Sequence, residues 1–123
     1  MRYSNIREEE LKNRVATDFF DDYDCDTIIQ NIDFSVRLKY NTIVDSDYFL
    51  WAEAKNKPTD INLMLTQLIL TIGKARTFDN IMPPPFLGCF DTEKITFIDY
   101  AEIKDIFYIT DFNWNITPSL VNT

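Results

Sequence analysis

Length and composition narrow the classes of protein that this chain can represent. The 123 residues suffice for one domain with one hydrophobic core, and we expect a single domain over residues 1–123. With 46% hydrophobic and 15% aromatic residues and only 2 Gly, the chain is too apolar to be disordered. Because it has no histidine, Ser-His-Asp and Cys-His catalysis and histidine-bearing metal sites are excluded.

The net charge of −8 bears on the partners of the protein. An acidic chain is a poor stand-alone binder of nucleic acid, because phosphate affinity comes mainly from Lys and Arg. Residues 1–10 are charged, and no apolar run approaches the roughly 18 residues of a membrane span, so we expect a cytoplasmic protein without membrane contact. Cys25 and Cys89 lack the paired spacing of a zinc site, and we interpret both as structural.

The first half of the chain predicts a helix followed by strands. Leu11, Val15 and Phe19 recur every four residues, which favours an amphipathic helix over about residues 6–20. After an acidic stretch, residues 27–40 are rich in β-branched and aromatic side chains, and apolar and polar residues alternate from Ile32 to Lys39, which indicates one strand, or two short strands meeting near Asn31. A polar turn precedes a second strand at residues 48–55, and a hairpin is the simplest pairing.

The second half predicts a long helix and two further strands. Apolar residues at helical spacing run from Asp60 to about Ile81, with Thr59 or Asp60 as the N-terminal cap. The run Met-Pro-Pro-Pro ends this helix. Residues 86–90 and 95–100 read as strands joined by a turn, and about 101–123 as a linker or tail with at most one helical turn.

Three charged residues are expected to meet on the two strands of the hairpin. Glu53 and Lys55 are two positions apart in a strand and therefore share a face, and a suitable register brings Asp33 beside them. Two neighbouring carboxylates repel each other and favour a divalent cation, and their oxygens suit Mg²⁺ or Mn²⁺. Such an ion polarises a phosphodiester while Lys55 orients a water, which predicts hydrolysis of a nucleic-acid backbone.

The order helix, strand with Asp33, strand with Glu53-Ala54-Lys55 and long helix resembles the PD-(D/E)XK nuclease superfamily. The resemblance implies an α/β fold with a restriction-endonuclease-like core of order α-β-β-β-α-β, in which helices flank a mixed central sheet. It implies that Asp33, Glu53 and the backbone carbonyl of Ala54 ligate the metal and that Lys55 is catalytic. Gln67 resembles the glutamine that the RecB-like branch places beside its catalytic acids.

The same resemblance supplies an acid from the first helix, where Glu8, Glu9 and Glu10 are the candidates. The chain departs from the family pattern at two positions. Thr71 stands where the branch has Tyr, and Ile32 stands where the family has Pro before the first acid.

Three segments resemble, more narrowly, the amino-terminal nuclease region of bacterial restriction enzymes that carry a DNA methyltransferase on the same polypeptide. They are residues 31–36, 49–55 and 67–79, and the resemblance covers about residues 5–100. It implies a Mg²⁺-dependent endonuclease domain of a restriction-modification system, cut from a longer polypeptide whose methyltransferase or specificity domain helps to hold DNA. The choice of DNA over RNA and the formation of a homodimer stay open.

Helical spacing connects the long helix with the same site. Gln67, Thr71 and Lys74 share one flank of this helix, beside its apolar stripe. Lys74 is therefore a candidate phosphate contact, together with Lys57 and Arg76.

Other readings of the same residues remain. Glu53 and Lys55 can form an ordinary ion pair on an exposed strand. The negative charge suits a catalytically inactive interaction module of nuclease fold, or an acidic protein that mimics DNA. Asp22, Asp24, Asp26 and Asp33 have the spacing of calcium ligands in an EF-hand loop, but Thr27 stands where that loop needs Gly. A sugar-cleaving carboxylate pair would leave Lys55 without a role.

Overall fold

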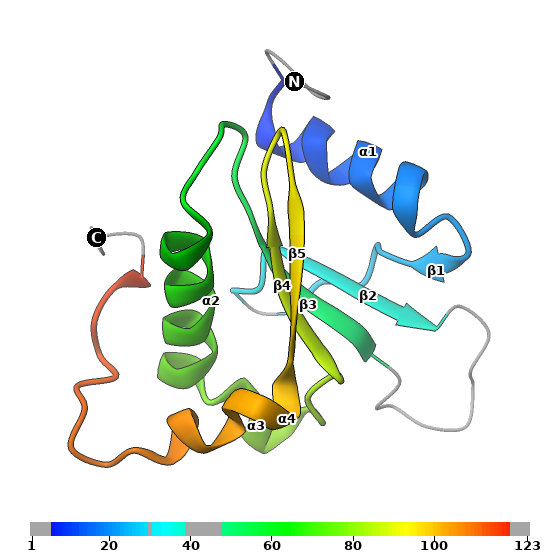
Figure 1. Cartoon of the computed structure of the whole chain (residues 1–123). Helices are drawn as coiled ribbons and strands as arrows, with labels where there is room; N and C mark the ends of the chain where they lie inside the picture. Colours follow the sequence, from blue (N-terminus) through cyan, green and yellow to red (C-terminus); the bar gives the residue numbers. More distant parts are fainter. Residues whose placement is uncertain (1–5, 30, 39–47, 119–123) are drawn as a thin grey trace.

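The computed structural model describes residues 6–29, 31–38 and 48–118, which form a five-stranded sheet flanked by helices (Figure 1). The strands lie in the order β1-β2-β3-β4-β5. Neighbouring strands are antiparallel except for β3 and β4, which are parallel, so the sheet is mixed. The strands are β1 (Tyr23–Asp24), β2 (Phe34–Leu38), β3 (Tyr48–Ala54), β4 (Phe86–Phe90) and β5 (Ile95–Asp99).

The helices are α1 (Glu8–Phe19), α2 (Ile61–Ala75), α3 (Thr77–Asn80) and α4 (Tyr100–Ile103), with the 3₁₀ helix η1 (Lys104–Tyr108) after α4. Helix α1 confirms the predicted amphipathic helix. Its first turn contains three glutamates, whose negative charges are favourable near the positive N-terminal end of the helix dipole. Leu11 and Val15 are buried against the sheet.

The predicted pairing of the first long strands is confirmed. β2 and β3 are antiparallel with Phe34 opposite Ala52, while the predicted turn at residues 41–47 lies outside the described residues. The described part of residues 27–40 contains one strand, β2, and Asn31, with a positive φ of 66°, breaks the extended run before it. The short strand β1 comes from the acidic stretch, for which no strand was expected.

The predicted long helix is shorter than expected. Asp60 caps α2 by accepting a hydrogen bond from the Leu63 N–H at 3.0 Å. The helix ends because Arg76 adopts the left-handed conformation, with φ 49°, and the single turn α3 follows. The chain then enters β4, so that α2 forms the crossover between the parallel strands β3 and β4.

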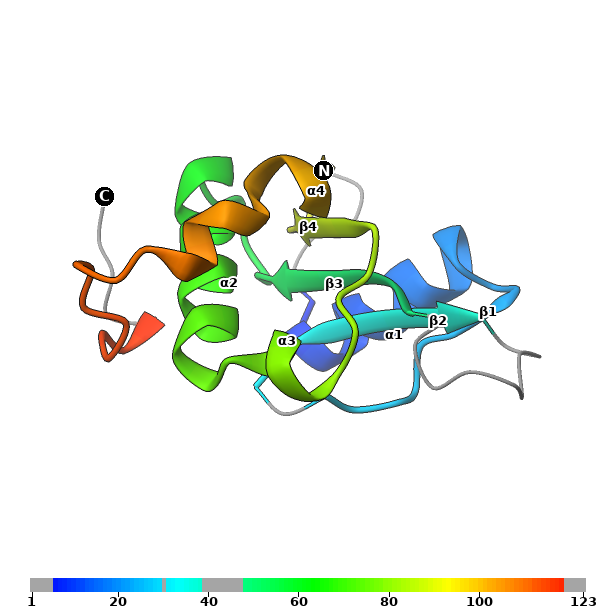
Figure 2. The same ribbon diagram turned by 90° about the horizontal axis from the view of Figure 1, so that it is seen from below.

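Alternate residues of β3 pack into two clusters on opposite faces of the sheet. Leu50, Ala52 and Ala54 join α1 in one cluster, whereas Trp51 joins α2 in the other. Figures 1 and 2 show the two helices on either side of the sheet. Because Glu53 and Trp51 are two residues apart, the Glu53 side chain lies on the α2 face, next to a wholly buried core.

The described residues after β5 pack beside α2, while the last residues of the expected linker or tail, 119–123, lie outside the described residues. Residues 100–108 form α4 and η1, and Phe107 is 2% exposed. Phe107 belongs to the hydrophobic cluster that contains Trp51, and Trp114 packs against this cluster. The segment runs beside α2 in both views (Figures 1 and 2).

Candidate active site

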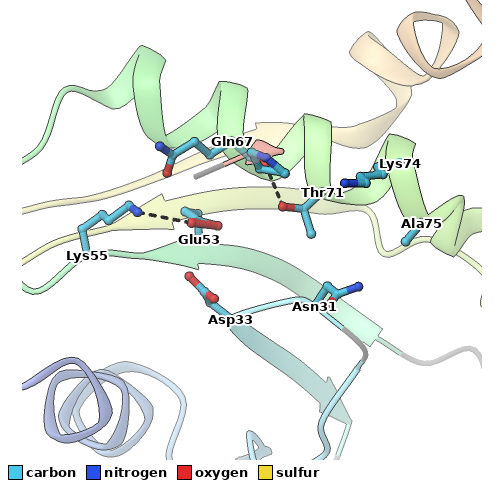
Figure 3. A pocket seen from close by; sticks show the side chains of 9 residues that line it. Asn31, Asp33, Glu53, Lys55, Gln67, Thr71, Lys74 and Ala75 are labelled. Carbon is cyan, nitrogen blue, oxygen red and sulfur yellow. Dashed lines mark hydrogen bonds and ion pairs between the residues drawn. The ribbon is translucent and has the colours of Figure 1, made fainter. Parts of the chain in front are cut away.

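A cavity of about 600 Å³ lies where the end of β3 meets α2 (Figure 3). It collects side chains that are far apart in the sequence, and all four residues predicted to be catalytic line it. The lining residues are Asn31, Asp33, Glu53, Lys55, Gln67, Thr71, Lys74, Ala75 and Pro118.

Asp33 is the residue just before β2, and its side chain lines this cavity. The next residue, Phe34, pairs with Ala52, and the side chains of Asp33 and Glu53 line the same cavity beside α2. The Ala54 N–H donates a hydrogen bond of 3.1 Å to Oδ2 of Asp33, whereas the Lys55 N–H donates to the Phe90 carbonyl in β4 at 3.0 Å. The main-chain groups of Ala54 therefore face the Asp33 side of β3.

Glu53 is a carboxylic acid in an unfavourable place for a negative charge. Burial, the neighbouring negative charge of Asp33 and a hydrogen bond with Asp33 raise the pKa of Glu53 to about 8, while Lys55 opposes the shift. The Lys55 Nζ lies 3.7 Å from Oε1 of Glu53, and both side chains are mostly buried. Glu53 and Lys55 consequently do not form the ordinary ion pair on an exposed strand that is the alternative reading of these residues.

Of the three candidate acids of the first helix, Glu8 is the one whose pKa is shifted by burial, Asp33 and Lys55, although it does not line the cavity. Burial and the charge of Asp33 raise the pKa of Glu8, while Lys12 and Lys55 lower it. Glu9 and Glu10 are instead exposed and form ion pairs on the helix surface, with Lys12 at 2.7 Å and with Arg14 at 3.5 Å.

Gln67 is buried on α2, and its Oε1 atom has no hydrogen-bond partner among the described residues. An unpaired buried carbonyl of this kind costs about 1–3 kcal/mol. Thr71, one turn further, donates its hydroxyl to the main-chain carbonyl of Gln67 at 2.9 Å (Figure 3) and does not satisfy the amide. The cavity thus contains an acceptor that is free for a ligand.

Of the three predicted phosphate contacts, only Lys74 lines the cavity. Lys74 is exposed and lines the cavity. Lys57 is exposed outside the lining, and Arg76 is held by Asp79 at 2.6 Å and lies over the Phe78 ring. Lys55 and Lys74 are therefore the cations of this cavity within the described ranges.

Sequence reasoning missed three lining residues, Asn31, Ala75 and Pro118. Asn31 carries a left-handed backbone, and an asparagine just before an alternating strand is a weak signal for such a turn. Pro118 comes from the segment expected to be a tail, and nothing in its sequence pattern places it near Glu53.

In the described part of the chain, no three Asp, Glu or Cys side chains are grouped so that they could hold a metal ion. The side-chain donors at the candidate centre are therefore the pair Asp33 and Glu53. Both cysteines are free and lie outside the lining of this cavity, and burial raises the pKa of each thiol to about 11. Neither thiol has the character of a nucleophile at neutral pH.

No family model matches the sequence, and neither the curated proteins nor the solved structures compared with it give a significant match. None of the helices formed by residues 6–29, 31–38 and 48–118 is both long and apolar enough to cross a bilayer.

Proposed function

We propose that the protein is a metal-dependent nuclease domain of PD-(D/E)XK type that hydrolyses DNA phosphodiester bonds. The observation that carries the proposal is the meeting of Asp33, Glu53 and Lys55 in one cavity, with Gln67 above them on α2 (Figure 3). A buried acid with a raised pKa beside a second acid and a lysine is typical of functional sites.

The arrangement of elements supports the same proposal. One helix precedes three antiparallel strands, a crossover helix follows, and the next strand is parallel to the third. This is the order α-β-β-β-α-β of the superfamily that the sequence resembles. Among the residues of the proposal, Asp33 directly precedes β2, Glu53 lies at the end of β3 and Lys55 directly follows β3, which is adjacent to β2 in the sheet.

The donors present fit Mg²⁺ or Mn²⁺. Mg²⁺ is commonly held by one or two carboxylates, with water and substrate oxygens completing its shell, so Asp33 and Glu53 suffice as side-chain ligands. We assign the Ala54 carbonyl as the third protein ligand, because the Ala54 main chain faces Asp33. When bound, the ion supplies charge stabilisation to the phosphate and makes a bound water more acidic.

The remaining residues have separate roles in this proposal. Lys55, beside Glu53, stabilises the charge that develops on the phosphate and orients the attacking water. The free Oε1 of Gln67 accepts a hydrogen bond from a bound water. Lys74, at the rim, contacts a neighbouring phosphate.

The test is cleavage of plasmid DNA in Mg²⁺ or Mn²⁺ by the protein and by its Glu53→Ala and Lys55→Ala variants. Each substitution should reduce the rate by about 100-fold or more, because it removes a metal ligand or a group that stabilises charge at the phosphate. Arg14→Ala, which alters an exposed ion pair outside the cavity, is the matched control. Cleavage retained by either site variant, with folding verified by circular dichroism, would defeat the assignment.

A second function is favoured by the charge of −8, which opposes binding to DNA. In this reading the domain keeps a nuclease fold as an inactive interaction module or DNA mimic. Calorimetric titration with Mn²⁺ separates the two functions. Saturable binding that is lost in Asp33→Ala supports the nuclease, and absence of binding at millimolar Mn²⁺ supports the module.

The wider setting is part of the proposal. We place the domain in a cytoplasmic restriction-modification polypeptide, where a methyltransferase or specificity domain would compensate for the acidic surface. Sequencing the complete reading frame tests this setting, since a methyltransferase motif beyond Thr123 is expected.

A further inference from the structure

Asp33 lies just outside the regular sheet. β2 begins at Phe34, so the Asp33 main chain does not share in the regular ladder of β2 with β3. The preceding turn contains the left-handed Asn31 and a hydrogen bond of 3.0 Å from the Ile32 N–H to the Ile29 carbonyl. The position of the Asp33 carboxylate thus depends on contacts other than strand pairing.

Two hydrogen bonds hold Asp33, one to its side chain and one to its main chain. The Ala54 N–H in β3 donates to its carboxylate at 3.1 Å. The Lys12 Nζ, from α1, donates to its main-chain carbonyl at 3.3 Å. The Lys12 side chain is only 17% exposed, and its ammonium is also 2.7 Å from the Glu9 carboxylate, which fixes its direction.

We propose that Lys12 is a positioning residue for Asp33: by holding the main chain of this residue against α1, it keeps the carboxylate at the Ala54 N–H. The positioning is a property of the metal-free protein. Its consequence for metal binding rests on the proposed function, in which Asp33 is a ligand.

Replacing Lys12 should change the affinity for a divalent cation, and the direction of this change distinguishes a positioning role from a purely electrostatic one. Lys12 is a cation near Asp33 and Glu8, so removing its charge alone should strengthen the binding of a divalent cation. Removing a group that orients a ligand should weaken binding, typically by about 10- to 100-fold. The two roles therefore predict opposite changes.

Hydrogen exchange of two adjacent amides tests the positioning without any metal. In Lys12→Met, which keeps the apolar length of the side chain, the Ala54 amide should exchange about 10-fold faster or more. The Lys55 amide, bound to the Phe90 carbonyl, should keep its protection. Lys12→Arg should restore the protection of Ala54, and Arg14→Met on the exposed side of α1 should change neither amide.

Equal protection of Ala54 in the protein and in Lys12→Met would overturn the proposal. Lys12→Gln, which retains a donor without the charge, provides a second variant if the methionine variant does not fold. Faster exchange of Ala54 and Lys55 together would also contradict positioning, because it would indicate general destabilisation.

Titration calorimetry with Mn²⁺ adds the functional readout. The dissociation constant should rise about 10-fold in Lys12→Met and return toward the original value in Lys12→Arg. Tighter binding in Lys12→Met would mean that Lys12 acts through its charge alone, against the proposal. Absence of Mn²⁺ binding in the unaltered protein would count against the nuclease function, and the exchange experiment would still decide the role of Lys12.

Discussion

The pKa of Glu53 is set mainly by burial, by Asp33 and by Lys55. Burial and the adjacent Asp33 disfavour its negative charge, and Lys55 compensates only in part. A protein that needed only stability would place a neutral residue here. Destabilising placements of this kind are common at active sites, which agrees with the proposed function.

This placement of Glu53 predicts how stability depends on pH. The pKa of Glu53 is higher in the folded state, about 8, than its ordinary value of 4.5, so the folded state binds the proton more tightly. The stabilisation is complete below about pH 4.5 and is lost as the pH rises through about 8. Glu53→Gln should consequently raise the free energy of unfolding by about 4 kcal/mol near pH 8 and by less than about 1 kcal/mol near pH 5.

Urea unfolding of both proteins in EDTA, at the two pH values, measures this difference. Glu10→Gln is the matched control, because Glu10 is an exposed acid on α1 whose ion pair contributes little. A Glu53→Gln protein that is less stable than the original near pH 8 would contradict the placement of Glu53 in the interior.

At the scale of elements, the C-terminal segment is joined to α2 through a glycine. A methyl group on Gly73 would overlap the Trp114 ring, so the absence of a side chain at Gly73 lets the indole lie against the helix. The Trp114 Nε1–H donates to the Ile109 carbonyl at 3.1 Å, which fixes the ring within its own segment. This contact leads the chain toward Pro118 at the cavity.

Because Trp114 lies against Gly73, replacing this glycine by alanine should lower the stability of the protein instead of raising it. Gly→Ala in a helix interior normally stabilises by about 1 kcal/mol, but Gly73→Ala should destabilise by about 1 kcal/mol or more because Trp114 is displaced. In a Trp114→Ala background, Gly73→Ala should become stabilising. Urea unfolding of the four proteins of this double-mutant cycle measures the coupling, and additive effects would refute the contact.

At the scale of the whole molecule, the net charge of −8 opposes DNA binding. Lys55 and Lys74 lie at the site, within a chain of 20 acidic and 12 basic residues. The protein by itself should therefore bind DNA weakly, through few phosphate contacts. This expectation agrees with a nuclease domain that depends on another domain for affinity.

The salt dependence of binding tests this expectation. With two phosphate contacts, the logarithm of the binding constant for duplex DNA should fall with the logarithm of salt concentration with a slope of about −2. Lys74→Gln should reduce the slope by about one, and Lys104→Gln, on the exposed η1 outside the cavity, should leave it unchanged. Fluorescence anisotropy in EDTA measures both, and equal effects of the two variants would contradict binding at the cavity.

Local patterns in the sequence predicted most of the elements, because periodicity reports which side of an element is buried. The spacing of Leu11 and Val15 predicted α1, and the alternation around Phe34 and Val36 predicted β2. Asp60 marked the start of α2 within one residue. The end of that helix was placed too late, because apolar spacing continues into α3 past the left-handed Arg76.

The site was predicted in part, for a physical reason that differs between residues. Glu53 and Lys55 share a face through the strand period of two, which is readable locally. Which of the three glutamates of α1 lies close enough to Asp33 for their charges to interact depends on how α1 is rotated against the sheet, and three consecutive glutamates do not reveal this rotation.

The sequence by itself determined the order of elements, the apolar faces and the chemical character of the acidic and basic residues, since these are local properties of the chain. Only the tertiary structure decided that Asp33 meets the Ala54 N–H, that Lys12 reaches the Asp33 carbonyl and that Pro118 returns to the cavity. These contacts join residues 21 or more positions apart, and their geometry follows from the packing of whole elements rather than from any local preference.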